Sequence, residues 1–196
     1  MSLIRVTAPA VLPVTERSVW DFLRLSLGGE VPPDSADVRT LIEAAADTLD
    51  GAEGWLGRAL VTQTWVLRLD EFPHSNIDLP LPPLRTVDSV AYLDTSGTET
   101  TLSADRYHAT GVGDFGRLVP VTSWPATARR PEAVRITFTC GYGDGPDAVP
   151  EPIKVTLRQM VALTYDTRTP MNIGNIVNRL PDMGLDALAR FKVWSF

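Results

Sequence analysis

The sequence predicts an α+β fold, in which an N-terminal helix pair and C-terminal helices form a helical core that carries a central antiparallel β-rich insertion. Two changes of periodicity along the 196 residues support this prediction. Apolar residues first recur three and four positions apart, then alternate with polar residues, and finally return to the helical spacing. We therefore expect one domain with a helical part at 1–60, the β-rich insertion at 61–148 and the C-terminal helices and tail at 149–196.

Two helices are expected in the first part. Thr15 is a suitable N-cap for the first helix, and Gly28-Gly29 ends it. Its apolar stripe consists of Val19, Phe22, Leu23 and Leu25. Asp34 or Ser35 caps the second helix, which has a carboxylate in its first turn. Its apolar positions are Val38, Leu41, Ile42, Ala45, Leu49 and Ala52. The prolines in Ser2–Pro13 favour an extended arm that lies on its own or on a neighbouring subunit.

The middle part predicts strands. Thr62–Asp70 and Val134–Cys140 alternate strictly between apolar and polar residues, as half-buried strands do. Shorter strand candidates lie at Thr86–Leu93, Arg106–Ala109 and Arg117–Val121. Glycine-containing turns separate them, which predicts an antiparallel meander.

Three prolines lie directly before the strand at Thr86–Leu93. Proline fixes φ and removes a backbone donor, so Leu79–Leu84 is expected to run as an extended, edge-like arm. We expect this arm to contact a neighbouring subunit. The residues assigned to that contact are Leu79, Pro80, Leu81, Pro82 and Pro83.

The last part predicts one long helix, one short helix and an aromatic chain end. Pro152 fits the first helical position, where its missing N–H costs nothing. The buried stripe of this helix is Ile153, Leu157, Met160, Val161 and Thr164. A short helix is expected at Leu185–Val193. Aromatic residues gathered at a chain end are rarely left in water, so 191–196 either folds back onto its own core or docks into a partner.

Composition excludes several classes of protein. Apolar residues make up 44% of the chain, which is enough for a core and excludes a disordered protein. With 24 acidic and 18 basic residues, the net charge of −6 disfavours sequence-independent binding to DNA. The last 48 residues nevertheless hold six basic and four acidic residues, so an acidic partner would meet the C-terminal segment. No apolar run approaches the length of a membrane span.

The candidate chemical motifs all have structural readings that fit better. Gly111–Gly116 matches the GxGxxG pattern, but a strand follows it where a dinucleotide site needs a helix, so we expect a hairpin loop. Cys140 with His74 or His108 is a candidate thiol nucleophile and base, yet Cys140 lies on the apolar face of its strand. A single cysteine and two dispersed histidines give no zinc spacing. We expect no catalytic residues, no cofactor and no metal.

A series of segments, in order, resembles the head–tail connector (adaptor) proteins of tailed bacteriophages and gene transfer agents. The segments are Val14-Thr15, Phe22–Leu25, Asp34 to Asp37, Leu41–Ala45, Gly57–Leu60, Gln63–Trp65, Leu79–Leu93, Trp124–Ala126, Val134–Gly143, Val149–Ile153 and Val193–Phe196. Together they span most of the chain.

The resemblance implies a structural protein without a catalytic role. Such proteins form a ring of about a dozen copies, as a closed cyclic oligomer, beneath the portal, and DNA passes through the ring without specific binding. The implied partners are further copies of the chain, the portal protein and a stopper or tail-completion protein. The implied location is the head–tail interface of a particle made in the bacterial cytoplasm. The residues expected to dock on the portal are Leu188, Phe191, Val193, Trp194 and Phe196.

Three alternatives remain open from the sequence. One is another head-completion or tail-terminator protein, whose mostly β fold would give little helix. Another is a small hydrolase that uses Cys140 or an acidic pair. The third is a cytosolic regulatory module, which would be a monomer.

Overall fold

The computed structural model describes residues 1–25, 30–167 and 186–193. The chain divides into two compact units, one made of 1–10 and 62–142 and the other of 11–61 and 143–196. The first unit contains the strands and the second contains the long helices. The predicted α+β class, a helical core with an antiparallel β-rich insertion, is confirmed.

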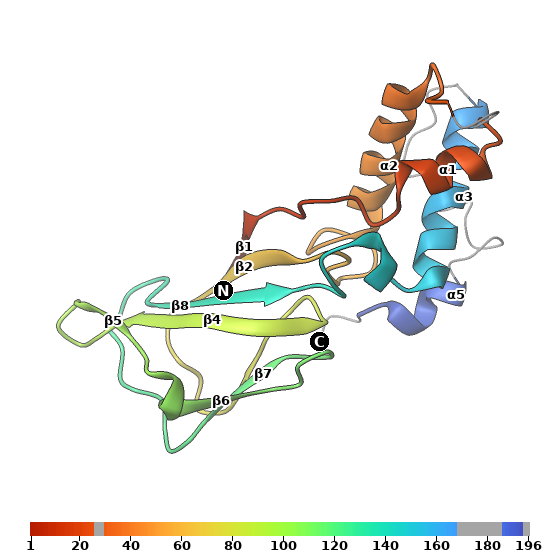
Figure 1. Ribbon diagram of the computed structural model, residues 1–196. Helices are drawn as coiled ribbons and strands as arrows, with labels where there is room; N and C mark the ends of the chain where they lie inside the picture. The colour runs from red at the N-terminus through yellow and green to blue at the C-terminus, as the bar shows by residue number, and fades with distance from the viewer. Residues whose placement is uncertain (26–29, 168–185, 194–196) are drawn as a thin grey trace. The chain divides into compact units, whose positions relative to one another are not determined.

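A five-stranded antiparallel sheet forms the larger part of the β unit, with the order β1-β2-β8-β4-β5. The bounds of these strands are β1 Ser2–Thr7, β2 Gln63–Leu69, β8 Val134–Cys140, β4 Leu84–Leu93 and β5 Glu99–Thr101. Figure 1 shows β8 lying between β2 and β4. The expected meander is therefore wrong, because its strands would follow one another in chain order. The two strands with strict alternation instead pair with each other, which places their apolar faces together at the centre of the sheet.

The apolar faces of the central strands form the core of the β unit. Trp65 lies opposite Phe138, and Leu67 lies opposite Ile136 in the register of β2 and β8. Ile136 and Phe138 are fully buried. Cys140 is also fully buried, and its Sγ lies 3.7 Å from the carbonyl oxygen of Gln63. This thiol therefore behaves as a small core side chain.

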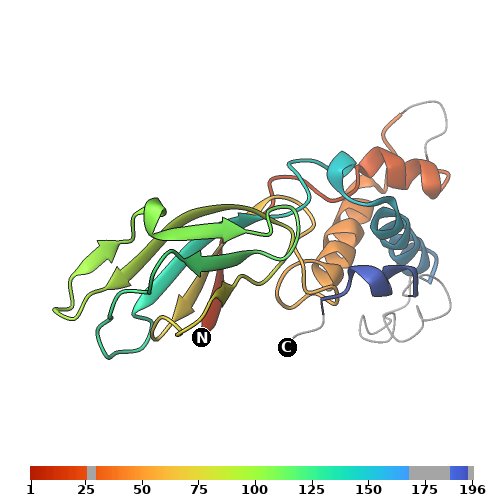
Figure 2. The ribbon, with the colours of Figure 1, turned by 90° about the horizontal axis from the view of Figure 1, so that it is seen from below.

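A three-stranded antiparallel sheet completes the β unit, with the order β3-β7-β6. Its strands are β3 Ile77–Asp78, β7 Arg117–Pro120 and β6 Tyr107–Thr110, and a short 3-10 helix, η1 (Ala104–Arg106), precedes β6. Figures 1 and 2 show β6 and β7 lying along one face of the larger sheet. A Cβ atom at Gly116 would lie 2.6 Å from Leu84 Cδ2, so this hairpin approaches β4 closely. The loop at Gly111–Gly116 joins β6 to β7, as expected of a glycine-rich hairpin.

The first helix of the other unit begins at the predicted cap. The Thr15 side chain accepts a hydrogen bond from the Ser18 amide, and α1 runs over Glu16–Phe22. The predicted stripe is partly wrong, because Val19 and Trp20 are buried whereas Phe22 is 47% exposed. The helix ends at Phe22, so the later residues of the predicted apolar stripe lie outside it.

Helices α2 (Ser35–Leu49) and α3 (Glu151–Thr167) pack side by side and supply half of the buried apolar residues described in the helical unit. A short 3-10 helix, η2 (Pro146–Ala148), precedes α3. The buried apolar residues of α2 and α3 keep the helical spacing and are Val38, Ile42, Ala45, Ala46, Leu49, Ile153, Leu157, Met160 and Val161. The predicted stripes are partly wrong, because Leu41 and Thr164 are only half-buried and Ala52 is exposed beyond the end of α2. Asp34 precedes α2 but makes no capping bond, and its Oδ2 accepts the Tyr165 hydroxyl at 2.8 Å. This bond joins the start of α2 to the end of α3.

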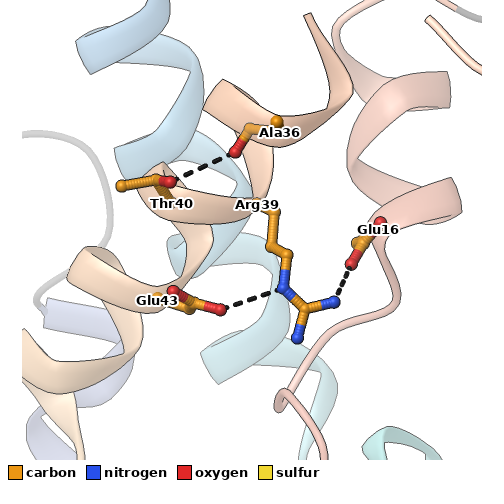
Figure 3. Close-up of polar contacts among 5 residues, drawn as sticks. All are labelled: Glu16, Ala36, Arg39, Thr40 and Glu43. Carbon is orange, nitrogen blue, oxygen red and sulfur yellow. Dashed lines mark hydrogen bonds and ion pairs between the residues drawn. The ribbon is translucent and has the colours of Figure 1, made fainter.

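An arginine on α2 connects the first two helices at the surface (Figure 3). Arg39 Nη1 lies 2.8 Å from Glu16 Oε1 on α1, and its Nε lies 3.0 Å from Glu43 Oε1 one turn further along α2. The Arg39 side chain is 58% exposed, so we expect this pair of contacts to contribute at most about 1 kcal/mol. The α1–α2 packing therefore depends mainly on buried apolar residues.

Candidate assembly surfaces

The C-terminal segment folds back onto its own unit as far as residue 193. It consists of α5 (Asp186–Leu188) and the 3-10 turn η4 (Ala189–Phe191). Leu188 is fully buried, and the Val193 amide donates to the carbonyl oxygen of Leu56 at 2.8 Å. Arg58 Nε donates to the carbonyl oxygen of Phe191 at 2.5 Å. Two hydrogen bonds thus fix the segment to the loop that follows α2, and α5 contacts α3.

The loop at 55–58 is shaped to receive this segment. Lys192 Nζ lies 4.4 Å from the centre of the Trp55 ring, a cation–π contact. Gly57 has a φ of +64°, and a Cβ atom there would lie 3.3 Å from the Cβ atom of Val193. Only glycine adopts this conformation without strain. Local backbone geometry therefore lets the chain end approach closely.

The five residues that the sequence assigned to portal docking differ in how deeply they are buried. Leu188 is buried within its own unit, whereas Phe191 and Val193 are partly exposed. Trp194 and Phe196 lie outside the described residues. Leu188 therefore positions the segment, and its side chain is not available as an anchor for a partner.

The proline-containing segment has a structural role in its own unit. Leu79, Leu81, Pro82 and Pro83 are buried, and Pro80 is partly exposed. The Leu79 amide donates to the carbonyl oxygen of Gly116 at 2.8 Å. A contact with a neighbouring subunit stays a prediction, and Pro80 has the most surface left for it.

Sequence reasoning missed an open groove of about 760 Å³ in the β unit. Two loops, 70–74 and 120–131, line it. Trp124 stacks on Phe72 with ring centres 4.9 Å apart, and Trp124 Nε1 donates to the Ser75 carbonyl oxygen at 2.8 Å. The Trp124-Pro125 pair was the available signal, but nothing in the sequence shows that residues so far apart stack together.

The resolved pKa shifts have ordinary structural causes. The Ser96 side chain and the Thr98 amide lower the pKa of Asp94 within a turn. Lys154 lowers the pKa of Glu151 at the start of α3, and burial raises the pKa of Tyr107. Hydrogen bonds from Arg68 and Ser2 lower the pKa of Glu132. These groups hold turns, a helix start and a sheet edge, and none pairs with Cys140.

The described residues contain neither a metal-binding cluster nor a membrane-spanning helix. Within 1–25, 30–167 and 186–193, no group of three or more His, Cys, Asp or Glu side chains is placed to hold a metal ion. No helix in the same ranges is long and apolar enough to span a membrane.

No protein-family model and no curated protein sequence matches this chain. Its fold, however, matches chains in solved structures of gene transfer agent (GTA) particles. In the virion of a native GTA particle, one chain matches with a TM-score of 0.70 and 22% identity, over 91% of this chain and 94% of that chain. A chain in the neck of an empty GTA particle, computed with C6 symmetry, matches with a TM-score of 0.75 and 21% identity.

A third match is a chain in the neck of a native GTA particle computed with C12 symmetry, with a TM-score of 0.70 and 21% identity. Both neck comparisons cover 100% of this chain and 97% of the other. Both units of this protein are thus included in the likeness. The chain has the fold of proteins found in the virion and neck of gene transfer agent particles.

Proposed function

We propose that this chain is a structural subunit of the neck of a phage-like particle, where it serves as the adaptor between head and tail. The observation that carries the proposal is the fold likeness to neck chains over the whole length of this protein. A shared fold is compatible with several functions. Because the likeness covers both units and the chains have nearly equal lengths, it supports the same structural role in the particle.

A ring of identical copies is the proposed form of the assembly. The neck structures that contain the similar chains were computed with C6 and C12 symmetry, and we propose a dodecamer. In a cyclic ring of this kind each copy contacts its two neighbours through different surfaces. This chain therefore needs two complementary contact surfaces, besides those that meet the portal and the tail-side partner.

The charge of the protein suits a channel through which DNA moves. The net charge is −6, and acidic surfaces repel the phosphate backbone. A wall that held DNA by many basic contacts would slow its passage. We propose that the ring extends the channel of the portal and lets DNA pass through without specific binding.

The C-terminal residues are the proposed contact with the portal. The segment up to Val193 is held by Arg58 and Leu56, so residue 193 is a fixed point on the helical unit. Trp194 and Phe196 follow that point in the sequence, and buried aromatic anchors often dominate the binding energy of an interface. A stopper or tail-completion protein is the proposed partner on the other side of the ring.

Deletion of Trp194–Phe196 tests this assignment, because it keeps the hydrogen bond of Val193. We expect the deletion variant to fold and form rings like the wild type, as measured by circular dichroism and negative-stain electron microscopy. It should no longer attach to portal-bearing heads in a co-sedimentation assay. Normal attachment of the folded variant would refute the docking role of these residues.

The alternatives have less support. A tail terminator with a mostly β fold was expected to have little helix, whereas this chain has two helices of 15 and 17 residues, α2 and α3. A thiol hydrolase needs an accessible nucleophile, whereas Cys140 is fully buried in the sheet. We propose no catalytic role for this chain.

A further inference from the structure

The N-terminal strand leaves one edge of the larger sheet open. Strand β1 pairs with β2 on one side and ends the strand order. Within 1–25, 30–167 and 186–193, no other strand pairs with its second edge. Ile4 is 41% exposed and Val6 is 61% exposed. Natural sheet edges are usually blunted by lysine, proline or a short strand, and β1 has six residues with neither lysine nor proline.

This edge is held in place before any partner arrives. The Ser2 hydroxyl donates to Glu132 Oε1 at 3.1 Å, and Arg68 Nη1 donates to Glu132 Oε2 at 2.7 Å. The Glu132 amide in turn donates to Asp70 Oδ1 at 2.9 Å. At the middle of the strand, the guanidinium carbon of Arg5 lies 5.8 Å from the centre of the Trp65 ring. An edge that is already ordered loses little conformational entropy when another strand joins it.

The opposite side of the sheet is protected in ways that β1 is not. Strand β5 has only three residues, all of them polar, and Glu99 on it forms an ion pair with Arg135. Strand β1 has six residues and pairs with β2 in regular register from Ser2 to Arg5, with one irregularity between Arg5 and Thr7. Short polar edge strands are a common device against edge-to-edge pairing. Of the two outer strands of this sheet, β1 and β5, β1 is therefore the one whose edge is open to a partner.

We propose that β1 is an assembly surface, to which a second copy of this chain adds a backbone segment by strand pairing. This inference rests on the proposed function, because the neck chains with this fold belong to structures computed with C6 and C12 symmetry. A cyclic ring of more than two copies requires contacts between unlike surfaces. The edge of β1 therefore meets a different part of its neighbour, and β1 does not pair with another β1.

Two valine substitutions test the proposal with a matched control. Val6 on β1 and Val112 in the β6–β7 loop belong to the same unit and are 61% and 65% exposed. Lysine at an edge blocks strand addition, so Val6→Lys should weaken ring formation by at least about tenfold, which corresponds to about 1.4 kcal/mol. Val112→Lys should leave it unchanged. The readout is the concentration at which rings appear in mass photometry and electron microscopy, with melting temperature as the check on folding.

Hydrogen exchange gives a second measurement that needs no substitution. The amides of 2–7 on the open edge should exchange quickly in the dilute monomer and slowly in the ring. Protection of all of them in the monomer would overturn the inference, as would rings of Val6→Lys that form like those of the wild type. A two-fold dimer that stops at β1–β1 pairing would also overturn it. Wild-type protein that remains monomeric, even with portal-bearing heads, would instead refute the proposed function and this inference with it.

Discussion

Replacing Leu188 by alanine should release the C-terminal segment while leaving the rest of the helical unit folded. Leu188 is fully buried, and truncation of a buried leucine to alanine typically costs about 2–5 kcal/mol. The segment itself is short and is otherwise held by Arg58 and by the Val193 amide. The loss therefore acts on docking of 186–193 before it acts on the core of α2 and α3.

The Val193 amide reports this docking directly, because it donates to Leu56 only when the segment is in place. At about 1.4 kcal/mol per factor of ten, a loss of 2 kcal/mol would speed its exchange by about thirtyfold. If the free energy of docking is smaller than the free energy lost in Leu188→Ala, the Val193 amide should exchange at the rate of an unfolded chain. Native-state hydrogen exchange followed by NMR distinguishes these two results.

A control variant separates docking from general destabilisation. Val155 on α3 is 39% exposed, so Val155→Ala should leave the Val193 amide protected. Amides within α2 should keep most of their protection in Leu188→Ala. An unchanged Val193 exchange rate in Leu188→Ala would refute the reasoning, because it would mean that the buried leucine does not hold the segment.

Two further substitutions probe the backbone and the sheet edge. Gly57→Ala should lower the free energy of unfolding by about 1–2 kcal/mol from its positive φ alone, and by more because its Cβ would lie 3.3 Å from Val193. Gly97→Ala, at a φ of +83° with no atom within 4 Å of the new Cβ, should show only the first effect; equal losses in denaturant titrations would contradict the steric part. The pKa of Glu132 is lowered because Arg68 and Ser2 donate hydrogen bonds to its carboxylate. The stability that this contact adds is therefore fully present above the ordinary pKa of 4.5. It is lost as the pH falls through the lower pKa of the folded state. Glu132→Gln should therefore flatten the acid limb of the unfolding free energy below pH 4.5, and an unchanged limb would exclude this contact as its source.

Local patterns in the sequence were sufficient for the elements that bury one clear face. The alternation in Val134–Cys140 and the three-four spacing from Val38 to Leu49 each predicted a strand or helix and its buried residues. Thr15 was identified as a cap because a hydroxyl before a helix can accept an amide of its first turn. These features depend on interactions within a few residues, so the sequence contains nearly all the information about them.

Features that depend on distant partners were beyond such reasoning. The pairing of β2 with β8 follows from which strands bury one another best, and no local signal encodes it. Phe22 was favoured over Trp20 because of its spacing, although the short α1 buries Trp20. The segment Leu79–Pro83 has the composition of an extended, edge-like arm, yet most of it is buried in the β unit and Leu81 has a positive φ of 60°. The candidate surfaces at β1 and at 186–193 likewise exist only because chain ends meet residues far away in sequence.

The two candidate surfaces belong to different units, which separates self-association from attachment. The open edge of β1 is in the β unit, and the C-terminal segment is in the helical unit. A Val6→Lys chain should therefore still recognise the portal, though as single copies whose binding lacks the avidity of a ring. A chain without Trp194–Phe196 should form rings that do not attach. If either change abolished both ring formation and attachment in a folded protein, the assignment of one function to each unit would be wrong. Ring formation and attachment would then have to share one surface.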